Sequence, residues 1–343
     1  MESTPNGEIP VFRGDIVNSP ESTLEARTPD PERLLRAYSQ SAASLNMLRA
    51  LAKSSETMLD WVRLIDRLAP EKYAAFVEQI EDALNFLTAC GLDVTSSTEG
   101  LQNLREPEFY SSHEALLLSY ESALTRPYED PETGETLWYN SSAHMLWVGE
   151  RTRQLDGAHV EFLRGVQNAI GVKVGPTMEP SELLSLIDTL NPRNEEGKIM
   201  LIVRMGCDRI ADGLPQLLRA VKREGRYVVW SIDPMHGNTI KVGNGIKTRP
   251  FEKILAEVDA FFAAHEAEGT VPGGVHLEMT GEEHVTECLG GDVNEITEER
   301  LMENFKSTCD PRLNGTQSIE MAFEVGHRLR KIAKEARRKQ SHR

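Results

Sequence analysis

From about residue 110 onward, short apolar runs alternate with longer stretches of helical periodicity. The apolar runs lie at residues 115–118, 144–148, 171–174, 199–203, 227–232 and 274–277, and the helical stretches at 159–166, 180–190, 210–223, 251–268 and 318–334. Apolar runs separated by helices are typical of buried parallel strands. The pattern predicts an α/β fold, either a barrel or a doubly wound sheet, and polar residues follow the carboxyl ends of the strands, where a (β/α) barrel builds its active site.

The N-terminal third has a different pattern of apolar and polar residues. Residues 1–30 are rich in Pro, Glu, Ser and Thr and predict an extended arm, whereas Leu34, Leu35, Tyr38, Leu45 and Leu48 have helical spacing. Further helices are predicted around 56–69 and 71–90. We therefore divide the chain into an arm (1–30), a helical decoration packed on the following domain (31–95), a partial (β/α) barrel as the catalytic domain (96–335) and a basic tail (336–343).

Composition narrows the possible partners. The 343 residues carry a formal net charge of −16, which argues against nucleic acid, because phosphate backbones favour clustered Lys and Arg. Neither a signal peptide nor a run of ~18 apolar residues is found, which predicts a soluble, cytoplasmic protein without membrane contact. The four cysteines form no CxxC pair, so reduced thiols are expected.

Charged residues follow the run at 144–148 directly. Glu150, Arg151 and Arg153 come just after Trp147-Val148-Gly149. A structural ion-pair network is one interpretation. The other is a binding site for a phosphorylated carboxylic acid, because the planar Arg fork matches such oxygens at two points. Lys173 and Arg204 occupy equivalent places on two other runs, so these cations are expected to form an anion-binding ring at one rim.

Three further residues have the chemistry of metal ligands. His236 lies three residues after Asp233 in a turn, Glu278 follows His276 at period two, and Asp310 lies in the string CDPRLN. A structural histidine is the competing interpretation of His236. One imidazole with two carboxylates suits Mn²⁺, Co²⁺, Fe²⁺ or Zn²⁺.

Several strings resemble the core motifs of one family, in that family's order. They are SAHMLWVGERTRQLDGAHVEF, DPMHGNT, GIKTRPF, AEVDAFFAAHEAEG, PGGVHLEMTG, VTECLGG and CDPRLN. The chain thereby resembles the plant-type (class II) 3-deoxy-D-arabino-heptulosonate 7-phosphate (DAHP) synthases, from about residue 10 to 330. The resemblance implies a (β/α)8 barrel that condenses phosphoenolpyruvate with erythrose 4-phosphate, releasing phosphate, in the first step of the shikimate pathway. An amino analogue of the aldose remains an open alternative.

The resemblance also implies roles for individual residues. Glu150, Arg151, Lys173 and Arg204 would bind phosphoenolpyruvate and the sugar phosphate. His236, Glu278 and Asp310 would bind the divalent metal, with Mn²⁺ the first expectation, and Lys247 would lie near the aldehyde. Water activated near Glu150 or the metal would complete the attack on phosphoenolpyruvate, and a homo-oligomer is expected.

The sequence departs from the family pattern at its beginning. Neither a Gly-Gly-Asp-Cys-Ala-Glu string nor a Gly-Gln-Phe-Ala-Lys-Pro-Arg-Ser string occurs. The expectation is a chain without the family's N-terminal part, hence an incomplete barrel without the first two βα units. A fragmentary gene, completion by another polypeptide and a non-catalytic homologue that binds ligands or partners are the alternatives. Cys207 and Cys309 are candidate substitutes for the family's thiolate ligand, although buried packing is the simpler interpretation of each.

Overall fold

The computed structural model describes residues 2–4, 7–52, 108–243, 245–293 and 295–341, with short stretches between 73 and 90. It divides into two compact units, Met1–Phe109 and Tyr110–Arg343. The boundaries of the four predicted segments stay predictions. Among the described residues, no helix is both long and apolar enough to cross a bilayer.

In the N-terminal unit, the predicted helix from residue 31 is confirmed as α2, Pro31–Ala52. Before it, strands β1 (Glu2–Thr4) and β2 (Gly7–Ile9) pair antiparallel, and a short helix α1 spans Leu24–Arg27. The buried side chain of Asn18 joins this segment, because its amide donates to the carbonyls of Val11 and Arg27. The helix predicted at 56–69 lies outside the described residues, as does most of the one at 71–90.

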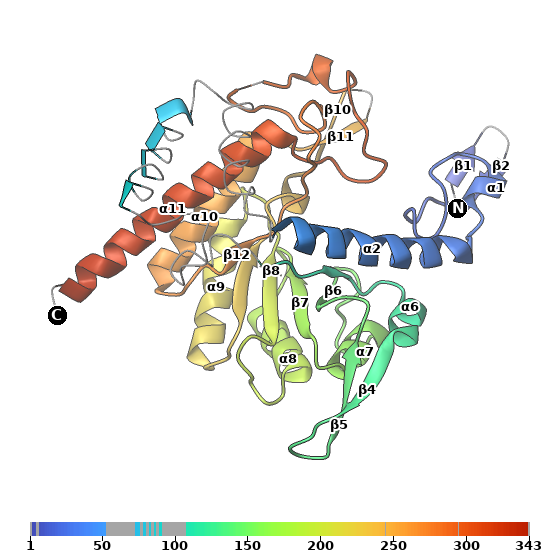
Figure 1. The fold of residues 1–343 in the computed structure, drawn as a ribbon, viewed down its shortest axis with the longest axis horizontal. Coiled ribbons are helices and arrows are strands. Elements are labelled where there is room, and N and C mark those ends of the chain that lie inside the picture. Colours follow the sequence, from blue (N-terminus) through green and yellow to red (C-terminus); the bar gives the residue numbers. More distant parts are fainter. Residues whose placement is uncertain are drawn as a thin grey trace. The chain divides into compact units, whose positions relative to one another are not determined.

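The C-terminal unit is built on a parallel sheet of six strands in the order β12-β9-β8-β7-β6-β3 (Figure 1). The strands are β3 (Ser112–Glu114), β6 (Met145–Val148), β7 (Ala169–Val174), β8 (Ile199–Val203), β9 (Val229–Ile232) and β12 (Gly274–Val275). Each strand pairs with the next one of the sheet along the chain, and every pairing is parallel. This sequential order is that of a singly wound barrel.

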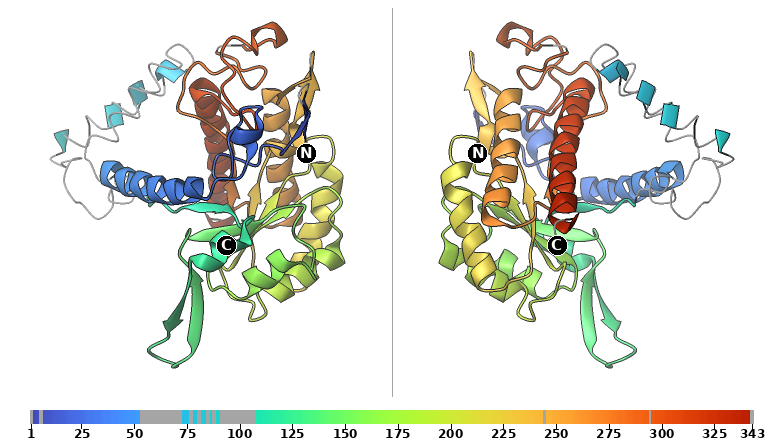
Figure 2. Two further views of the ribbon diagram at one scale, coloured as in Figure 1. Left: turned by 90° about the vertical axis from the view of Figure 1, so that its right-hand side faces the viewer. Right: turned by 90° about the vertical axis from the view of Figure 1, so that its left-hand side faces the viewer.

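Helices connect these strands at the predicted places. They are α7 (Ala158–Arg164), α8 (Pro180–Leu190), α9 (Ile210–Arg223) and α10 (Phe251–Glu268), followed by α11 (Gly315–Ser341). Neighbouring helices contact one another in chain order, and Figure 2 shows α8, α9 and α10 along one side of the sheet. The predicted α/β architecture is confirmed. The sheet is a curled half-barrel, because its edge strands β3 and β12 do not pair with each other among the described residues.

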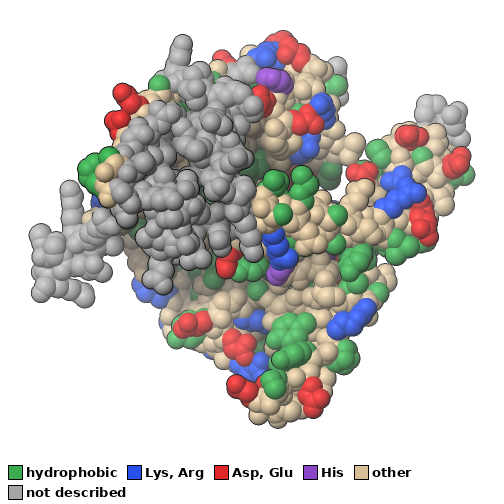
Figure 3. All heavy atoms as spheres, viewed as in Figure 1, with side chains coloured by type: hydrophobic (Ala, Val, Ile, Leu, Met, Phe, Trp, Pro, Cys, Tyr) green, Lys and Arg blue, Asp and Glu red, His purple; other side chains and the backbone are tan. Residues whose placement is uncertain are grey.

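The core lies between the sheet and its helices. Leu146, Ile170, Leu201 and Ile232 of the strands are fully buried, as is Phe261 of α10. Such uniformly apolar strands are what a sheet covered by helices requires. On the visible face in Figure 3, acidic and basic side chains are interspersed, so the net charge is not gathered into one patch there.

One predicted strand is wrong. The apolar run at 115–118 follows the first strand instead of forming it, and the strand is the polar segment Ser112–Glu114. β3 lies at the edge of the sheet and pairs with β6 only, so its side chains are partly exposed and the strand has no apolar signature. A small helix, α6 (Leu118–Ala123), follows it.

Two antiparallel hairpins of the C-terminal unit are not predicted by the sequence pattern. β4 (Thr125–Glu129) pairs with β5 (Thr136–Asn140), and β10 (Ile240–Val242) pairs with β11 (Ile246–Thr248). In the tight turn of the first hairpin, the Asp130 carboxylate accepts hydrogen bonds from the Thr133 hydroxyl and the Glu132 backbone N–H. The turn string DPETG was its available signal.

Candidate active site

The carboxyl ends of the strands bring most of the predicted site residues to one edge of the sheet. Val174 pairs with Val203 and Val203 with Ile232, so the residues that follow them lie side by side. Thus Arg204 donates its backbone N–H to the Val174 carbonyl at 2.9 Å, and Asp233 donates to Val203 at 2.7 Å. On the next strand, His276 donates to the Ile232 carbonyl at 2.7 Å.

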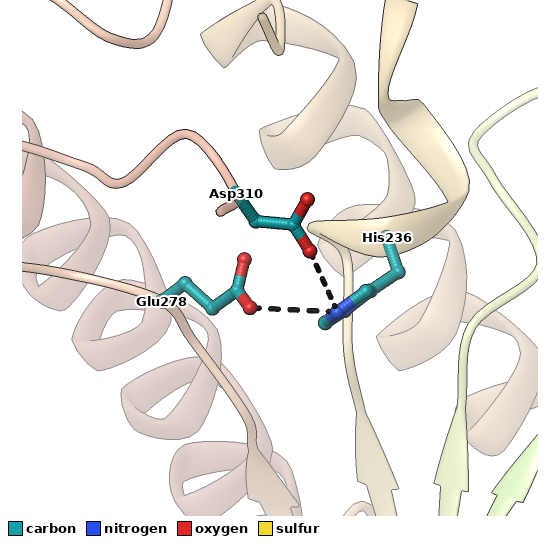
Figure 4. Close-up of side chains that lie close together, drawn as sticks. All are labelled: His236, Glu278 and Asp310. Carbon is teal, nitrogen blue, oxygen red and sulfur yellow. Dashed lines mark ion pairs between the residues drawn. The ribbon is translucent and has the colours of Figure 1, made fainter. Parts of the chain in front are cut away.

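Three potential ligand side chains meet beyond this edge (Figure 4). His236 Nε2 lies 3.4 Å from Glu278 Oε1 and 3.6 Å from Asp310 Oδ2. One ligand atom from each of the three residues lies within 4.8 Å of the others. Asp310 reaches the group because Leu313, three residues later, forms a parallel bridge with Met279.

Asp233 orients the imidazole of His236. The carboxylate of Asp233 is fully buried, and its Oδ2 lies 2.7 Å from His236 Nδ1 and 2.5 Å from the Lys173 ammonium. Burial opposes its ionisation, but hydrogen bonding to His236 and the charge of Lys173 hold the pKa of Asp233 well below its ordinary value. With Nδ1 engaged, the lone pair of Nε2 is directed towards Glu278 and Asp310, the usual arrangement of a metal-binding histidine.

Two cations neutralise the carboxylates of this cluster. The buried guanidinium of Arg249 binds Glu278 and lies 3.5 Å from Asp310 Oδ2, while the Lys247 ammonium binds Asp310 Oδ1. Burial would raise the pKa of Asp310, but the Lys247 hydrogen bond and the nearby Arg249 charge keep that pKa below its ordinary value. Asp310 is therefore available as an anionic oxygen ligand, beside the Glu278 carboxylate. The chemistry of this set fits a divalent cation.

The predicted anion-binding residues differ in their surroundings. Lys173 is buried in β7, paired with Asp233, and lies 5.7 Å from the centre of the Trp147 ring. Arg204 is half-buried and Arg151 is exposed. Among the described residues, neither guanidinium has a hydrogen-bonding or ionic partner. A cation at the strand edge without a protein partner is free to bind an anionic ligand.

Glu150 is held by a residue that the sequence prediction left without a role. Its Oε1 accepts a hydrogen bond from Arg153 Nη2 at 2.9 Å, and the buried Arg153 also binds Glu182 of α8. The other oxygen, Oε2, is buried and has no hydrogen-bond partner among the described residues. The carboxylate lies against Gly175, where a Cβ would be 2.5 Å from Oε1. The ion-pair interpretation therefore applies to Arg153, and Glu150 keeps one unpaired oxygen.

The remaining candidates play a smaller part in this geometry. His276 packs edge-on against Trp147 at 5.4 Å, and burial lowers its pKa to about 4, so it is a neutral packing residue outside the ligand cluster. Burial also raises the thiol pKa of Cys207 and of Cys309. Neither thiol belongs to the ligand cluster found among the described residues, so the proposed thiolate substitution gains no support.

Sequence reasoning missed the residues that organise the site. Asp233, Arg249 and Glu257 are fully buried charged residues, yet they were not assigned roles. Asp233 and Arg249 lie within the quoted strings DPMHGNT and GIKTRPF. A charged residue directly after an apolar strand, as in SID, was the available signal, since such a charge is rarely buried unpaired.

Comparison with known proteins agrees with this geometry. Residues 1–326 match the model of the class-II DAHP synthetase family. The chain is 45% identical over 328 residues to a phospho-2-dehydro-3-deoxyheptonate aldolase of Streptomyces coelicolor, covering 94% of this chain and 70% of that protein. It is 44% identical over 326 residues to phospho-2-dehydro-3-deoxyheptonate aldolase AroG of Mycolicibacterium smegmatis, covering 93% and 68%. The chain belongs to the class II DAHP synthetase family.

Proposed function

We propose that the chain is a DAHP synthase, a transferase that condenses phosphoenolpyruvate with erythrose 4-phosphate to give DAHP and inorganic phosphate. This reaction opens the shikimate pathway to the aromatic amino acids. The family match over residues 1–326 supports the reaction class. The observation that carries the proposal is structural: a metal-ligand set lies at the same carboxyl edge of the parallel sheet as two guanidinium groups without partners in the described part of the chain.

His236, Glu278 and Asp310 would hold a divalent metal. An imidazole nitrogen and two carboxylate oxygens suit Mn²⁺, with Co²⁺, Fe²⁺ and Zn²⁺ as alternatives. When bound, such an ion polarises the aldehyde carbonyl of the sugar phosphate. Lys247, whose ammonium already binds Asp310, would lie beside that aldehyde.

Arg151, Lys173 and Arg204 would bind the two phosphorylated substrates. Arg204 and Arg151 have guanidinium groups without described partners, and the planar fork suits carboxylate and phosphate oxygens. Lys173 would add a buried positive charge, which Asp233 partly neutralises. Holding two anions in attack position supplies much of the rate through orientation.

Glu150 would move a proton. The C3 atom of phosphoenolpyruvate would form a bond to the aldehyde carbon, and a water oxygen would add at C2. The C2–O bond to the phosphate then breaks, which leaves the C2 ketone and inorganic phosphate. The two protons of the water end on the hydroxyl formed from the aldehyde oxygen and on the released phosphate. The unpaired Oε2 of Glu150 would accept the proton that this water loses. Arg153 on the opposite oxygen would hold the carboxylate in place.

The same proposal includes the complete barrel, the oligomeric state and the cellular location. We propose that the six strands are consecutive members of a (β/α)8 barrel of the plant-type family, which the parallel, sequential pairing supports. A homo-oligomer would cover the edge strands, because exposed edges are seldom left bare. A cytoplasmic enzyme without nucleic-acid or membrane partners is consistent with the net charge of −16.

The experiment that tests the function is a coupled assay with the purified chain. Phosphate release and phosphoenolpyruvate consumption are followed with erythrose 4-phosphate and Mn²⁺, in the wild type and in Arg204→Met. We expect equal rates for the two signals and a KM for phosphoenolpyruvate at least tenfold higher in the variant. A folded wild-type chain that binds phosphoenolpyruvate but releases no phosphate would instead favour the non-catalytic homologue.

A further inference from the structure

We propose that Glu257 is a positioning residue that fixes the loop carrying Arg204 to the loop carrying His236. The Arg204 loop comprises residues 204–209, between β8 and α9, and the His236 loop comprises residues 233–239, after β9. The proposal rests on the function above, because it gives Glu257 the task of keeping a substrate-binding guanidinium and a metal-binding imidazole in a constant relation.

Glu257 binds the backbone directly after Arg204. The residue lies in α10 and is fully buried. Its Oε1 accepts the N–H of Met205 at 2.9 Å and the N–H of Gly206 at 2.7 Å. Hydrogen bonds from N–H groups to a carboxylate are stronger than those between neutral groups. The backbone on the carboxyl side of Arg204 is therefore held by one buried side chain.

Asn238 connects the same carboxylate to the second loop. Its amide nitrogen donates to Glu257 Oε2 at 2.7 Å and to the Pro234 carbonyl at 2.8 Å. Its amide oxygen accepts the N–H of Cys207 at 3.0 Å. Glu257 and Asn238 together accept three successive N–H groups after Arg204, and Asn238 itself belongs to the His236 loop.

The two loops also touch through their backbones. Gly206 has φ +87°, and a Cβ at Gly237 would lie 2.3 Å from the nitrogen of Gly206. Only glycine permits this approach at position 237. Because Gly237 follows His236 directly and Gly206 lies two residues after Arg204, a shift of either loop would displace the other.

Glu257 has no cationic partner among the described residues. Burial raises its pKa to about 7, and the N–H groups of Gly206 and Met205 oppose that rise. An apolar residue of similar shape would avoid the cost of burying a carboxylate but would leave these buried N–H groups without an acceptor. The two loops that Glu257 joins thus explain why a carboxylate is buried at this position.

The test exchanges donors and acceptors between the two side chains. In Glu257→Gln the new amide N–H₂ faces either the Asn238 amide, so that one hydrogen bond is lost, or the N–H groups of Met205 and Gly206, so that two are lost. In the double variant Glu257→Gln with Asn238→Asp, the new amide can donate to the new carboxylate. Glu266→Gln, a change at an exposed position of the same helix, is the matched control.

We expect Glu257→Gln to raise both the KM and the dissociation constant for phosphoenolpyruvate about tenfold. In the double variant, both constants should fall back by at least a third of that increase. The control should keep wild-type values. A Glu257→Gln variant that melts at a lower temperature yet keeps its affinity for phosphoenolpyruvate would overturn the proposal, since it would reduce Glu257 to a packing role. Binding is measured by calorimetry, so a chain without turnover would refute the proposed function and still test Glu257.

Hydrogen exchange of the wild-type chain gives a second, mutation-free test. The amides of Met205, Gly206 and Cys207 are expected to be as strongly protected as those of strand β8, even without substrate. Rapid exchange of these amides in a chain whose β8 amides remain protected would also overturn the proposal, because the bonds to Glu257 and Asn238 would then not persist in solution.

Discussion

Replacing Asp233 with Asn tests whether this buried carboxylate prepares His236 for metal binding. The substitution keeps the shape of the side chain and removes its charge. Lys173, 2.5 Å away, then loses its ionised partner, and His236 Nδ1 loses a charged acceptor at 2.7 Å. The perturbation thus reaches the metal-ligand set and the anion-binding set together.

The expected magnitude follows from these two contacts. Loss of a partner that orients a metal ligand typically costs 10–100-fold in affinity, or roughly 1.4–2.7 kcal/mol. Breaking a buried ion pair costs about 3–5 kcal/mol of stability, and we expect the lower end because Asn still offers an acceptor oxygen. The variant should therefore remain folded at room temperature while binding Mn²⁺ at least tenfold more weakly.

The assay is a calorimetric Mn²⁺ titration, with the free energy of unfolding measured by urea denaturation. Asp188→Asn is the control, because Asp188 forms a half-exposed ion pair with Arg226 outside the ligand cluster. The control should change neither quantity measurably. An Asp233→Asn chain that binds Mn²⁺ within twofold of the wild type would refute the reasoning, because His236 would then need no charged partner.

Three further predictions follow from other contacts. Gly175→Ala should raise the KM for phosphoenolpyruvate severalfold, because the new Cβ would displace the Glu150 carboxylate. Gly281→Ala is the control, because a Cβ there meets no described atom within 4 Å. Equal KM values for the two variants would contradict a role for the Glu150 position. Burial lowers the pKa of His265 to about 4, so between pH 4 and 6.5 the unfolded chain binds more protons than the folded chain, and the stability that the neutral imidazole contributes is lost as pH falls. In urea denaturation, the difference in unfolding free energy between wild type and His265→Gln should shrink by about 2 kcal/mol from pH 7 to pH 5. A difference that stays constant with pH would exclude this titration. Gly326→Ala in α11 should raise the free energy of unfolding by about 0.5–1 kcal/mol, because among the described residues nothing outside the local helix backbone lies within 4 Å of the new methyl group. A loss of stability on calorimetric melting would contradict an open helical site.

The sequence predicted those elements whose physical signal is local. The strands at 171–174 and 199–203 are apolar, apart from Lys173, because both faces of the sheet are buried there, and α8 and α9 have a clear apolar stripe. The polar strand β3 escaped prediction because an edge strand need not be apolar. The β4–β5 hairpin escaped because its side chains are largely exposed.

The candidate site was predictable only in part, for a similar reason. His236, Glu278 and Asp310 come from three separate segments, and only their motifs suggested that they meet. The supporting residues depend on tertiary contacts that leave no periodic signal: Glu257 of α10 reaches the loop after β8, more than 50 residues earlier. The roles of all these residues in substrate and metal binding stay predictions.

The most direct measurement of the central claim is anomalous diffraction from crystals of the chain grown with Mn²⁺ and phosphoenolpyruvate. We expect one strong manganese peak within coordination distance of His236 Nε2 and of the Glu278 and Asp310 carboxylates, with phosphoenolpyruvate against Lys173 and Arg204. A manganese peak elsewhere, or phosphoenolpyruvate bound away from the carboxyl edge of the sheet, would contradict it.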